Sequence, residues 1–204
     1  RGKVQVQLLI QAIQTVIGNH QAFRLIVSQQ PDEQVQSISS IQDTKINIFD
    51  FRNDSDPENT KKQWLQKQKI SPLSLNGQPH YYFAIYQMAD DHYGIFAKLH
   101  HFIFDGWSMQ LLTDQISRNY EKLSSGEPIH ITEDSSYLEF VYREKKYLDS
   151  KRAARDRAYW LNKFNAIPEQ IFQFNPDQLQ AKRKTYSLDS NLTSSIYKWV
   201  NKYD

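Results

Sequence analysis

The sequence predicts an α+β fold, a sandwich of helices packed on a mixed, mostly antiparallel sheet. Apolar residues recur at helical spacing from Val4 to Val16. The segments 80–88 and 92–99 have the pattern of a β-hairpin, and a second helical pattern follows from Trp107. The 204 residues, 39% of them hydrophobic, suffice for one core and are few for two independent domains. We therefore expect one domain, or one lobe of a larger one.

The first predicted element is a helix, followed by two strands. The apolar residues of the helix fall three or four positions apart, and Gly18 with Asn19 supplies the residue types that end helices in a left-handed turn. Strands are expected over 22–28 and 35–41, with a turn at 31–33. The apolar face of the helix comprises Val4, Leu8, Leu9, Ala12, Ile13 and Val16.

A polar helix and the hairpin come next. Residues 52–57 are typical of a loop, and the helix after them is predicted to lie on the surface, with Trp64 and Leu65 as its apolar contacts. Residues 89–91 form the predicted turn between the two aromatic-rich strands of the hairpin.

Helices dominate the region after the hairpin. The helix from Trp107 is predicted to end near 124–128, where Ser, Gly and Pro gather. Two further helices, over 135–148 and 152–164, are expected to pack on the outside of a sheet. The apolar residues of the helix from Trp107 are Leu111, Leu112, Ile116, Tyr120 and Leu123.

The last predicted elements are a strand over 182–188 and a helix that Asp189 caps and that runs through Val200. Both ends of the sequence have the pattern of internal cuts. Arg1 leads into a helix with no initiator Met and no signal segment, and the last helix is still running where the sequence stops.

The composition excludes several classes of partner. The 25 basic and 23 acidic residues are interleaved and give a formal net charge of +2, so no sustained basic field points to nucleic acid or an anionic membrane. The absence of cysteine excludes disulfides, a Cys nucleophile and thiolate metal sites. No run approaches the roughly 20 apolar residues of a membrane-spanning helix. With a mean hydropathy of −0.70, the sequence predicts a cytoplasmic protein.

Two adjacent histidines follow the second hairpin strand, at the start of the segment 100–108, His-His-Phe-Ile-Phe-Asp-Gly-Trp-Ser. Neighbouring side chains on an extended chain point to opposite faces, so His100 and His101 cannot clamp one metal ion together. If Leu99 faces the core, His101 lies on that side just past the end of the strand. There it can enter a cleft.

The residue types in this segment fit acyl transfer. A neutral imidazole can take a proton from an amine or hydroxyl that attacks an acyl carbonyl. Asp105 and Gly106 fall at the start of the helix, where a carboxylate caps backbone N–H groups and glycine lets the backbone approach a ligand. The N–H groups of Gly106, Trp107 and Ser108, with Ser108 Oγ, are predicted oxyanion donors. A role of Ser108 as covalent nucleophile is not favoured, because no nucleophile elbow surrounds it.

The pattern His-His-x-x-x-Asp-Gly of residues 100–106 resembles the signature of the superfamily that includes chloramphenicol acetyltransferase and the condensation domains of nonribosomal peptide synthetases. The continuation Trp107-Ser108 resembles condensation domains in particular and belongs to the supporting part of the site. The resemblance covers essentially the whole chain. Its other stretches are Asn-His-Gln-Ala-Phe-Arg at 19–24, Pro-Leu-Ser-Leu at 72–75 with Gly77 and Pro79, Tyr-Leu-Glu-Phe at 137–140, and Tyr159-Trp160.

The resemblance implies a chloramphenicol acetyltransferase-like lobe and a role for each residue of the site. His101 matches the family's catalytic histidine, which acts as general base on the acceptor amine or positions it. Gly106 matches the glycine whose small size keeps the substrate passage open. His100 matches a structural neighbour. Asp105 matches an aspartate that points away from the reaction centre and pairs with an arginine, and Arg24 fits that partner.

The family's reaction implies specific partners. It joins a donor acyl or peptidyl thioester and an acceptor aminoacyl group into an amide, each group held on the phosphopantetheine arm of a peptidyl carrier domain. The expected partners are therefore an upstream donor and a downstream acceptor carrier domain, a C-terminal lobe and an adenylation domain. No metal or cofactor is expected on this domain itself, since the phosphopantetheine arms belong to the carrier proteins.

Three departures from the family pattern accompany this resemblance. Residues 1–204 match the N-terminal lobe without the family's first motif, a Ser/Ala-x-x-Gln-x-Arg-Leu stretch. The second lobe, with its Asp-Phe-Gly-Trp-like motif, has no match either. Phe23 stands where a Leu is usual, which is a mild apolar exchange.

Three alternative functions stay open. An epimerisation domain shares the motif but usually follows Asp-Gly with a small residue, Ser and Trp, whereas this chain has Trp107, Ser108 and Met109. A free-standing acyltransferase of the same superfamily, acting on a CoA thioester or an alcohol, is also compatible with this lobe, although condensation is the favoured function. A noncatalytic docking lobe would have no need of a base, so the intact His101 argues against it.

Other conspicuous residues have simpler interpretations. The tryptophans at helical spacing, which are expected to be packing positions, are Trp64, Trp160 and Trp199. The cluster expected to form a solvated face, with a carrier-protein contact as the alternative, is Lys151, Arg152, Arg155 and Arg157. The histidines expected at the surface or in hydrogen bonds are His20, His80, His92 and His130.

Overall fold

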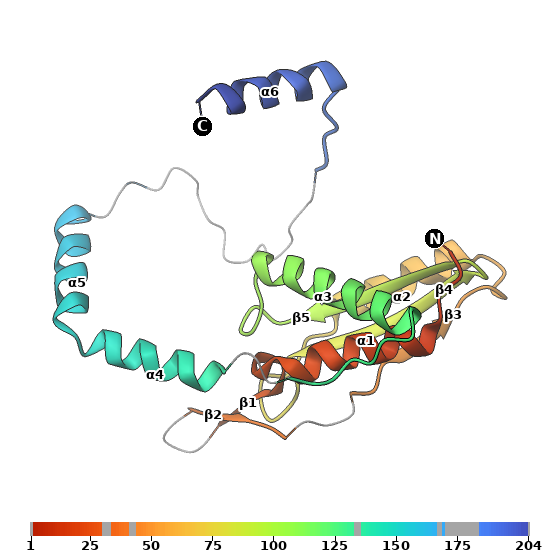
Figure 1. The fold of residues 1–204 in the computed structure, drawn as a ribbon, viewed down its shortest axis with the longest axis horizontal. Coiled ribbons are helices and arrows are strands. Elements are labelled where there is room, and N and C mark those ends of the chain that lie inside the picture. Colours follow the sequence, from red (N-terminus) through yellow and green to blue (C-terminus); the bar gives the residue numbers. More distant parts are fainter. Residues whose placement is uncertain are drawn as a thin grey trace. The chain divides into compact units, whose positions relative to one another are not determined.

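The computed structural model describes residues 2–29, 34–40, 44–132, 136–166, 169 and 184–203. The chain divides into two compact units, Arg1–Ala154 and Arg155–Asp204. In chain order the elements are α1 (Val6–Asn19), the 3₁₀ helix η1 (Gln21–Arg24), β1 (Leu25–Gln29), β2 (Gln34–Ile38), β3 (Asn47–Asp50), α2 (Pro57–Ile70), β4 (Tyr81–Ala89), β5 (His92–Leu99), α3 (Gly106–Ser124), α4 (Tyr137–Leu148), α5 (Lys151–Lys163) and α6 (Ser190–Tyr203) (Figure 1).

The sheets are mixed, as predicted. β4 and β5 form the expected antiparallel hairpin, with Tyr81 opposite Leu99, and β1 pairs with β2 in a separate antiparallel sheet. The sequence did not predict β3, which adds to the outer edge of β4 in parallel. A four-residue strand is too short to show a clear alternation of apolar and polar residues.

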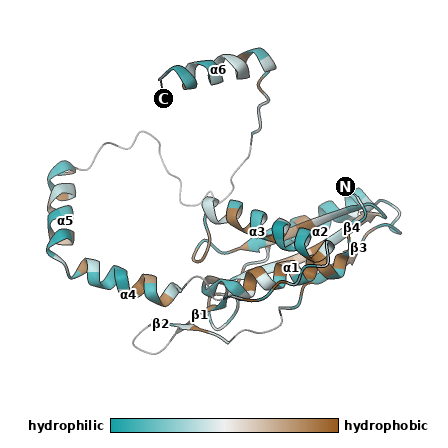
Figure 2. Cartoon of the chain, in the orientation of Figure 1, coloured by the Kyte–Doolittle hydropathy of each residue, from teal (hydrophilic) through white to brown (hydrophobic). Residues whose placement is uncertain are grey.

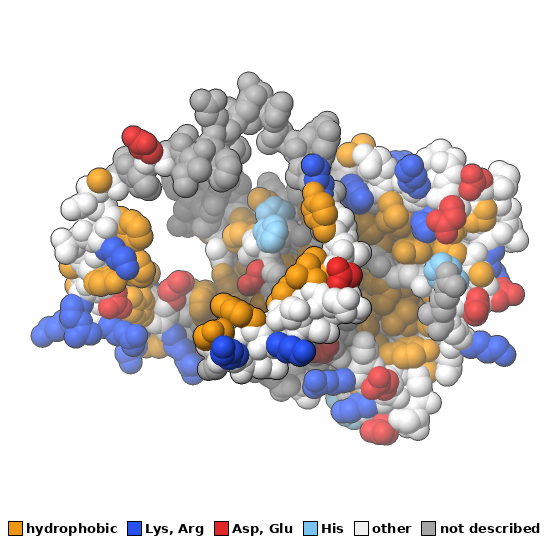
Figure 3. Space-filling model, turned by 90° about the horizontal axis from the view of Figure 1, so that it is seen from above, with side chains coloured by type: hydrophobic (Ala, Val, Ile, Leu, Met, Phe, Trp, Pro, Cys, Tyr) orange, Lys and Arg blue, Asp and Glu red, His pale blue; other side chains and the backbone are white. Residues whose placement is uncertain are grey.

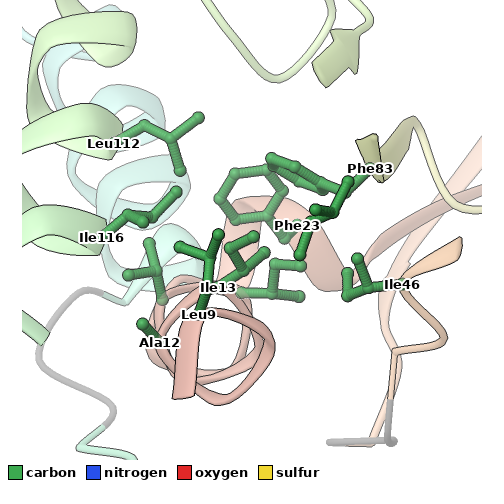
Figure 4. Close-up of a cluster of buried hydrophobic side chains, with 11 residues drawn as sticks. Leu9, Ala12, Ile13, Phe23, Ile46, Phe83, Leu112 and Ile116 are labelled. Atoms are coloured by element: carbon green, nitrogen blue, oxygen red, sulfur yellow. The ribbon is translucent and has the colours of Figure 1, made fainter. Parts of the chain in front are cut away.

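The core of the first unit lies between the β3–β4–β5 sheet and the two helices α1 and α3. Phe83 from β4 and Leu112 and Ile116 from α3 pack against the apolar face of α1 (Figure 4), and Ile85 from β4 belongs to the same cluster. Burial of these side chains is the main force that fixes the helices on this face of the sheet. The buried cluster comprises Leu9, Ala12, Ile13, Val16, Ile17, Phe23, Ile46, Phe83, Ile85, Leu112 and Ile116.

Helix α2 lies on the surface, as predicted, and covers the other face of the sheet through one residue. Trp64 packs against Phe49, Tyr86 and Phe96, with ring centroids 4.8, 6.0 and 5.2 Å away. In the strand pairing, Phe49 lies opposite Tyr86, and the side chains of these β residues alternate with those that face α1. The predicted packing role of Trp64 is confirmed, and no residue of α2 is buried.

The first predicted strand begins later than expected. Residues 21–24 form η1, and β1 starts at Leu25. The cause is the burial of Phe23, which turns into the core and contacts Tyr81 and Phe83 there. The predicted turn at 31–33 lies outside the described residues.

The predicted packing of the fourth helix on a sheet is wrong. Helix α4 has no buried residue, and Leu138 and Phe140 on it are more than half exposed. Its first residue, Tyr137, connects it to the unit: the backbone N–H donates to Gln21 Oε1 (2.8 Å) and the hydroxyl donates to Gln36 Oε1 (2.9 Å). Hydrogen bonds at one end, rather than a buried face, attach this helix.

Helices α5 and α6 also differ from the expectation that their tryptophans are buried packing positions. Neither helix has a buried residue. Trp160 stacks on Phe164 and Trp199 contacts Tyr203 at a tilt, but both tryptophans are more than half exposed. The basic residues of α5 are solvated, as predicted, and hydrophilic positions dominate that helix (Figure 2). Asp189 caps α6 by accepting the N–H of Leu192 (2.8 Å), which confirms that prediction. The described part of the predicted strand at 182–188 has no strand.

None of the described helices is both long and apolar enough to cross a membrane.

Candidate active site

The two histidines begin the loop that joins β5 to α3. The hairpin pairing extends one step beyond Leu99, since His100 N–H donates to the carbonyl of His80 (2.9 Å). Leu99 packs against the buried cluster, as the prediction for His101 required. The chain turns at His101, whose side chain is exposed just past the end of the strand.

A backbone carbonyl determines which nitrogen of His101 carries the proton. His101 Nδ1 lies 2.9 Å from the carbonyl oxygen of Phe104. A carbonyl oxygen can only accept, so Nδ1 donates, and in the neutral ring Nε2 keeps a free lone pair. The loop thus presents Nε2 of His101 as a base.

The carbonyl of Phe104 is held by packing and by turn hydrogen bonds. The Phe104 ring contacts the buried Phe23 at a centroid distance of 6.2 Å. Within the turn, His100 Nδ1 accepts the N–H of Phe102 (3.0 Å), and the His100 carbonyl accepts the N–H of Ile103 (3.0 Å). These contacts connect the position of His101 to the core.

Asp105 ends the loop and begins α3. Its Oδ1 accepts both the backbone N–H of Ser108 (2.8 Å) and Ser108 Oγ–H (2.6 Å), while Ser108 Oγ accepts the Asp105 N–H (3.4 Å). This reciprocal arrangement is a capping box. The hydrogen bonds from Ser108 lower the pKa of the exposed Asp105 carboxyl below its ordinary value, with a smaller contribution from the backbone of Trp107.

The predicted ion pair between Asp105 and Arg24 is not present. Arg24 is not among the partners of Asp105 in the described part of the chain; it is buried and donates from Nη1 to the carbonyl of Ser39 (2.8 Å). The reason is local, because the free N–H groups at the start of α3 lie within three residues of Asp105. Arg24 is instead the last residue of η1 and connects this helix to the residue after β2.

The set of predicted oxyanion donors is also reduced. Asp105 already binds the N–H and Oγ of Ser108, and the N–H of Trp107 faces the same carboxylate. Of the three N–H groups predicted to stabilise an oxyanion, the one on Gly106 is not engaged by the Asp105 carboxylate. Ser108 therefore shapes the loop, and its hydroxyl is not available as a donor to substrate.

Gly106 and Trp107 both border open space. A Cβ on Gly106 would meet no atom within 4 Å, and the side chain of Trp107 is 76% exposed. The site is thus accessible from the side of the first turn of α3. This is where the resemblance puts the substrate passage.

Three consecutive residues of the stretch 19–24 each bind a distant segment. Asn19 Oδ1 accepts the N–H of Thr132 (2.7 Å), and Gln21 accepts the N–H that begins α4. Between them, His20 Nε2 lies 2.7 Å from Gln115 Oε1 of α3. Below the loop, Phe104 and Ser108 line a small apolar pocket of about 110 Å³ together with His20.

The other histidines have different outcomes. His20 is hydrogen-bonded and His130 is exposed, as predicted, and His92 is half-buried at the start of β5. His80 differs from the prediction, because it is fully buried and neither of its ring nitrogens has a hydrogen-bond partner among the described residues. Over the same residues, no group of three or more His, Cys, Asp or Glu side chains is placed to hold a metal ion.

The fold and the loop define a class of α+β protein in which a His-His-x-x-x-Asp-Gly segment joins a strand to a helix. Within this class, the Condensation domain family model matches residues 1–204. The chain therefore belongs to the condensation domain family.

Relatives and solved structures agree with this assignment. The chain is 30% identical over 165 residues to surfactin synthase subunit 1 and 23% identical over 170 residues to a dimodular nonribosomal peptide synthase, both from Bacillus subtilis (strain 168). It covers 5% and 7% of those proteins, with 80% and 83% of its own length matched.

Among solved structures, VibH, an NRPS condensation enzyme, matches 98% of this chain with a TM-score of 0.79 at 21% identity. The starter condensation domain of rhizomide synthetase RzmA matches 79% with a TM-score of 0.72 at 22% identity. The chain spans 47% of the VibH chain and 39% of the RzmA chain.

Proposed function

We propose that these residues form the N-terminal lobe of a condensation domain that makes an amide bond between two carrier-bound substrates. The observation that carries the proposal is the hydrogen bond from His101 Nδ1 to the Phe104 carbonyl, which leaves Nε2 of an exposed histidine as a base. Family membership supplies the substrate class: a donor acyl or peptidyl thioester and an acceptor aminoacyl group.

The proposed reaction has two bond changes. The acceptor amine nitrogen attacks the thioester carbonyl carbon, and His101 Nε2 takes the proton that the amine loses as the C–N bond forms. The carbonyl oxygen becomes an oxyanion, which the N–H of Gly106 at the start of α3 stabilises. The C–S bond then breaks, and the departing thiolate recovers the proton from His101. No covalent enzyme intermediate is involved.

The test measures amide formation by the full-length protein from a donor-loaded and an acceptor-loaded carrier domain. We expect His101→Ala to lower the rate by about 100-fold or more, since it removes the base. His130→Ala is the matched control: it removes an exposed histidine outside the loop and should leave the rate unchanged. Full activity of the His101 variant would exclude this residue from catalysis.

We infer that the partners are an upstream donor and a downstream acceptor peptidyl carrier domain, with a C-terminal lobe and an adenylation domain adjoining. The curated relatives are synthases many times longer than this chain, which supports neighbouring domains. The phosphopantetheine arms enter as parts of the substrates, and the domain itself holds no cofactor in this proposal. We place the protein in the cytoplasm.

The alternatives are distinguished in the same assay. A free-standing acyltransferase would use an acyl-CoA in place of the donor carrier, and an epimerisation domain would invert the loaded aminoacyl group without forming an amide. A docking lobe would do neither. The order Trp107, Ser108, Met109 after Gly106 favours condensation.

A further inference from the structure

His80 is a buried histidine that the proposed reaction does not use. It immediately precedes β4 and stands opposite His100, one step beyond the pairing of Tyr81 with Leu99. Residues directly opposite in an antiparallel pair have side chains on the same face of the sheet. His80 and His100 are therefore neighbours on the face opposite to the buried cluster.

The surroundings of His80 disfavour its charged form. Its ring is 0% exposed and lies 6.2 Å from the His100 ring and 5.5 Å, edge-on, from the Phe102 ring, measured between centroids. Burial lowers the pKa of His80 and nearby His100 lowers it further, while the backbone of Ser74 acts in the other direction.

The free-energy cost of burying the His80 ring indicates that this histidine has a role beyond packing. The backbone of Ser74 lies close enough to His80 to affect its pKa, yet neither Nδ1 nor Nε2 makes a well-formed hydrogen bond with a described residue, and such a buried polar atom is destabilising. An apolar side chain would fill the same space without that cost. Packing alone therefore does not account for a histidine at this position.

The neutral His100 ring carries one proton, on either Nδ1 or Nε2. Its Nδ1 accepts the N–H of Phe102, so this nitrogen carries no proton and the neutral ring carries it on Nε2. Protonation of both nitrogens would abolish the bond to Phe102. The turn that holds the Phe104 carbonyl against His101 thus requires one tautomer of His100.

We propose that His80 is a positioning residue that accepts the Nε2–H of His100 and so fixes the tautomer that the loop needs. The ring centroids are 6.2 Å apart and no hydrogen bond joins the rings in the structure, so the proposed bond requires the two rings to approach each other. The effect reaches the base indirectly, from His80 to His100, through the turn to Phe104, and then to His101. The inference rests on the proposed function of His101.

The test compares two substitutions of similar length in the full-length protein. His80→Gln keeps a hydrogen-bond acceptor, whereas His80→Met fills the space with an apolar chain. We expect the Met variant to melt no lower than the native protein, yet to lose about tenfold in kcat with KM unchanged, while Gln restores most of kcat. Equal kcat for Met and Gln would show that His80 only fills space. If Met fails to fold, His80→Leu takes its place.

A second measurement does not depend on activity. Nitrogen-15 chemical shifts of the histidine rings report which nitrogen carries the proton, and we expect Nε2–H for His100 and Nδ1–H for His101 in the native and Gln proteins. In the Met variant, His100 should populate both tautomers. An unchanged His100 tautomer there overturns the proposal for His80, whatever the activity of His101→Ala. Full activity of His101→Ala overturns the proposed function instead.

Discussion

At the scale of single residues, one backbone carbonyl decides the chemistry of the loop. The sequence places two histidines before a capped helix, which identifies His101 as the candidate base. The choice between its two nitrogens depends on Phe104, three residues later, whose carbonyl turns toward Nδ1 while its ring packs on Phe23. The base is therefore specified partly by a residue far earlier in the chain.

Asp105 provides the first residue-scale prediction. Asp105→Ala removes the capping box and should lower the melting temperature, whereas Asp105→Asn keeps an oxygen for the Ser108 N–H and should lower it less. Thermal unfolding of both variants checks this. If the charge mattered through Arg24, Asn would be as damaging as Ala.

The pH dependence of the same variants has a definite sign. The folded-state pKa of Asp105 is lowered, so its contribution to stability is complete above the unfolded value of 3.8 and declines as pH falls through the folded value. The difference in melting temperature between the native protein and Asp105→Ala should therefore shrink on acidification below that range. A difference that grows on acidification would contradict this assignment.

Gly106 provides a prediction that separates folding from function. Because an added Cβ meets no atom within 4 Å, Gly106→Ala should fold normally and melt at the same or a slightly higher temperature. The methyl group would project into the open side of the site, so kcat/KM for amide formation should fall. Native kcat/KM in a stable Ala variant would show that the small size of Gly106 is not needed.

At the scale of elements, α3 connects the core to the site. Its first residues form the cap after the loop, and further along the helix its apolar face enters the buried cluster with Leu112 and Ile116. The helix is thus held by packing against α1, and it presents Gly106 and Trp107 at its exposed end. Figure 2 shows hydrophobic positions along α1.

Adjacent leucines in α3 allow a matched test of this packing. Leu112 is 5% exposed and Leu111 is 46% exposed. Leu112→Ala should lower the free energy of unfolding by about 2–5 kcal/mol, because it leaves a cavity between α3 and α1. Leu111→Ala removes the same atoms from a half-exposed position and should cost much less. Denaturant unfolding of the two variants measures the difference, and equal losses would contradict the packing described.

At the scale of the whole molecule, a large apolar surface remains exposed. Hydrophobic side chains are visible among basic and acidic ones at the surface (Figure 3). Trp107, beside the site, is 76% exposed, and His101 itself is open to solvent. Acyl transfer from a thioester competes with hydrolysis unless water is excluded from the reacting atoms. The described residues by themselves do not enclose His101.

This exposure leads to the whole-molecule prediction. Residues 1–204 expressed alone should fold the core around α1, α3 and the β3–β4–β5 sheet but form no amide, whereas the full-length protein should be active. Hydrogen exchange of the core amides checks the first part, and the assay with two loaded carriers checks the second. Amide formation by residues 1–204 at the full-length rate would show that no further wall is needed.

Local features of this protein followed from the sequence. The core face of α1, the β4–β5 hairpin and the caps of α3 and α6 each depend on residues within a few positions of one another, so periodicity and residue type suffice to predict them. The same holds for the His-His-x-x-x-Asp-Gly segment, which led to the family and to His101.

Only the tertiary structure decided which distant groups meet. It placed β3 parallel to β4, gave Arg24 the Ser39 carbonyl in place of Asp105, and buried His80 behind His100. No local pattern encodes these contacts, because each depends on how separate elements pack and on which nearby donor is closer. The sequence by itself determined the family and singled out His101 as the candidate base; the packed structure decided which of its nitrogens is free and what holds the ring there.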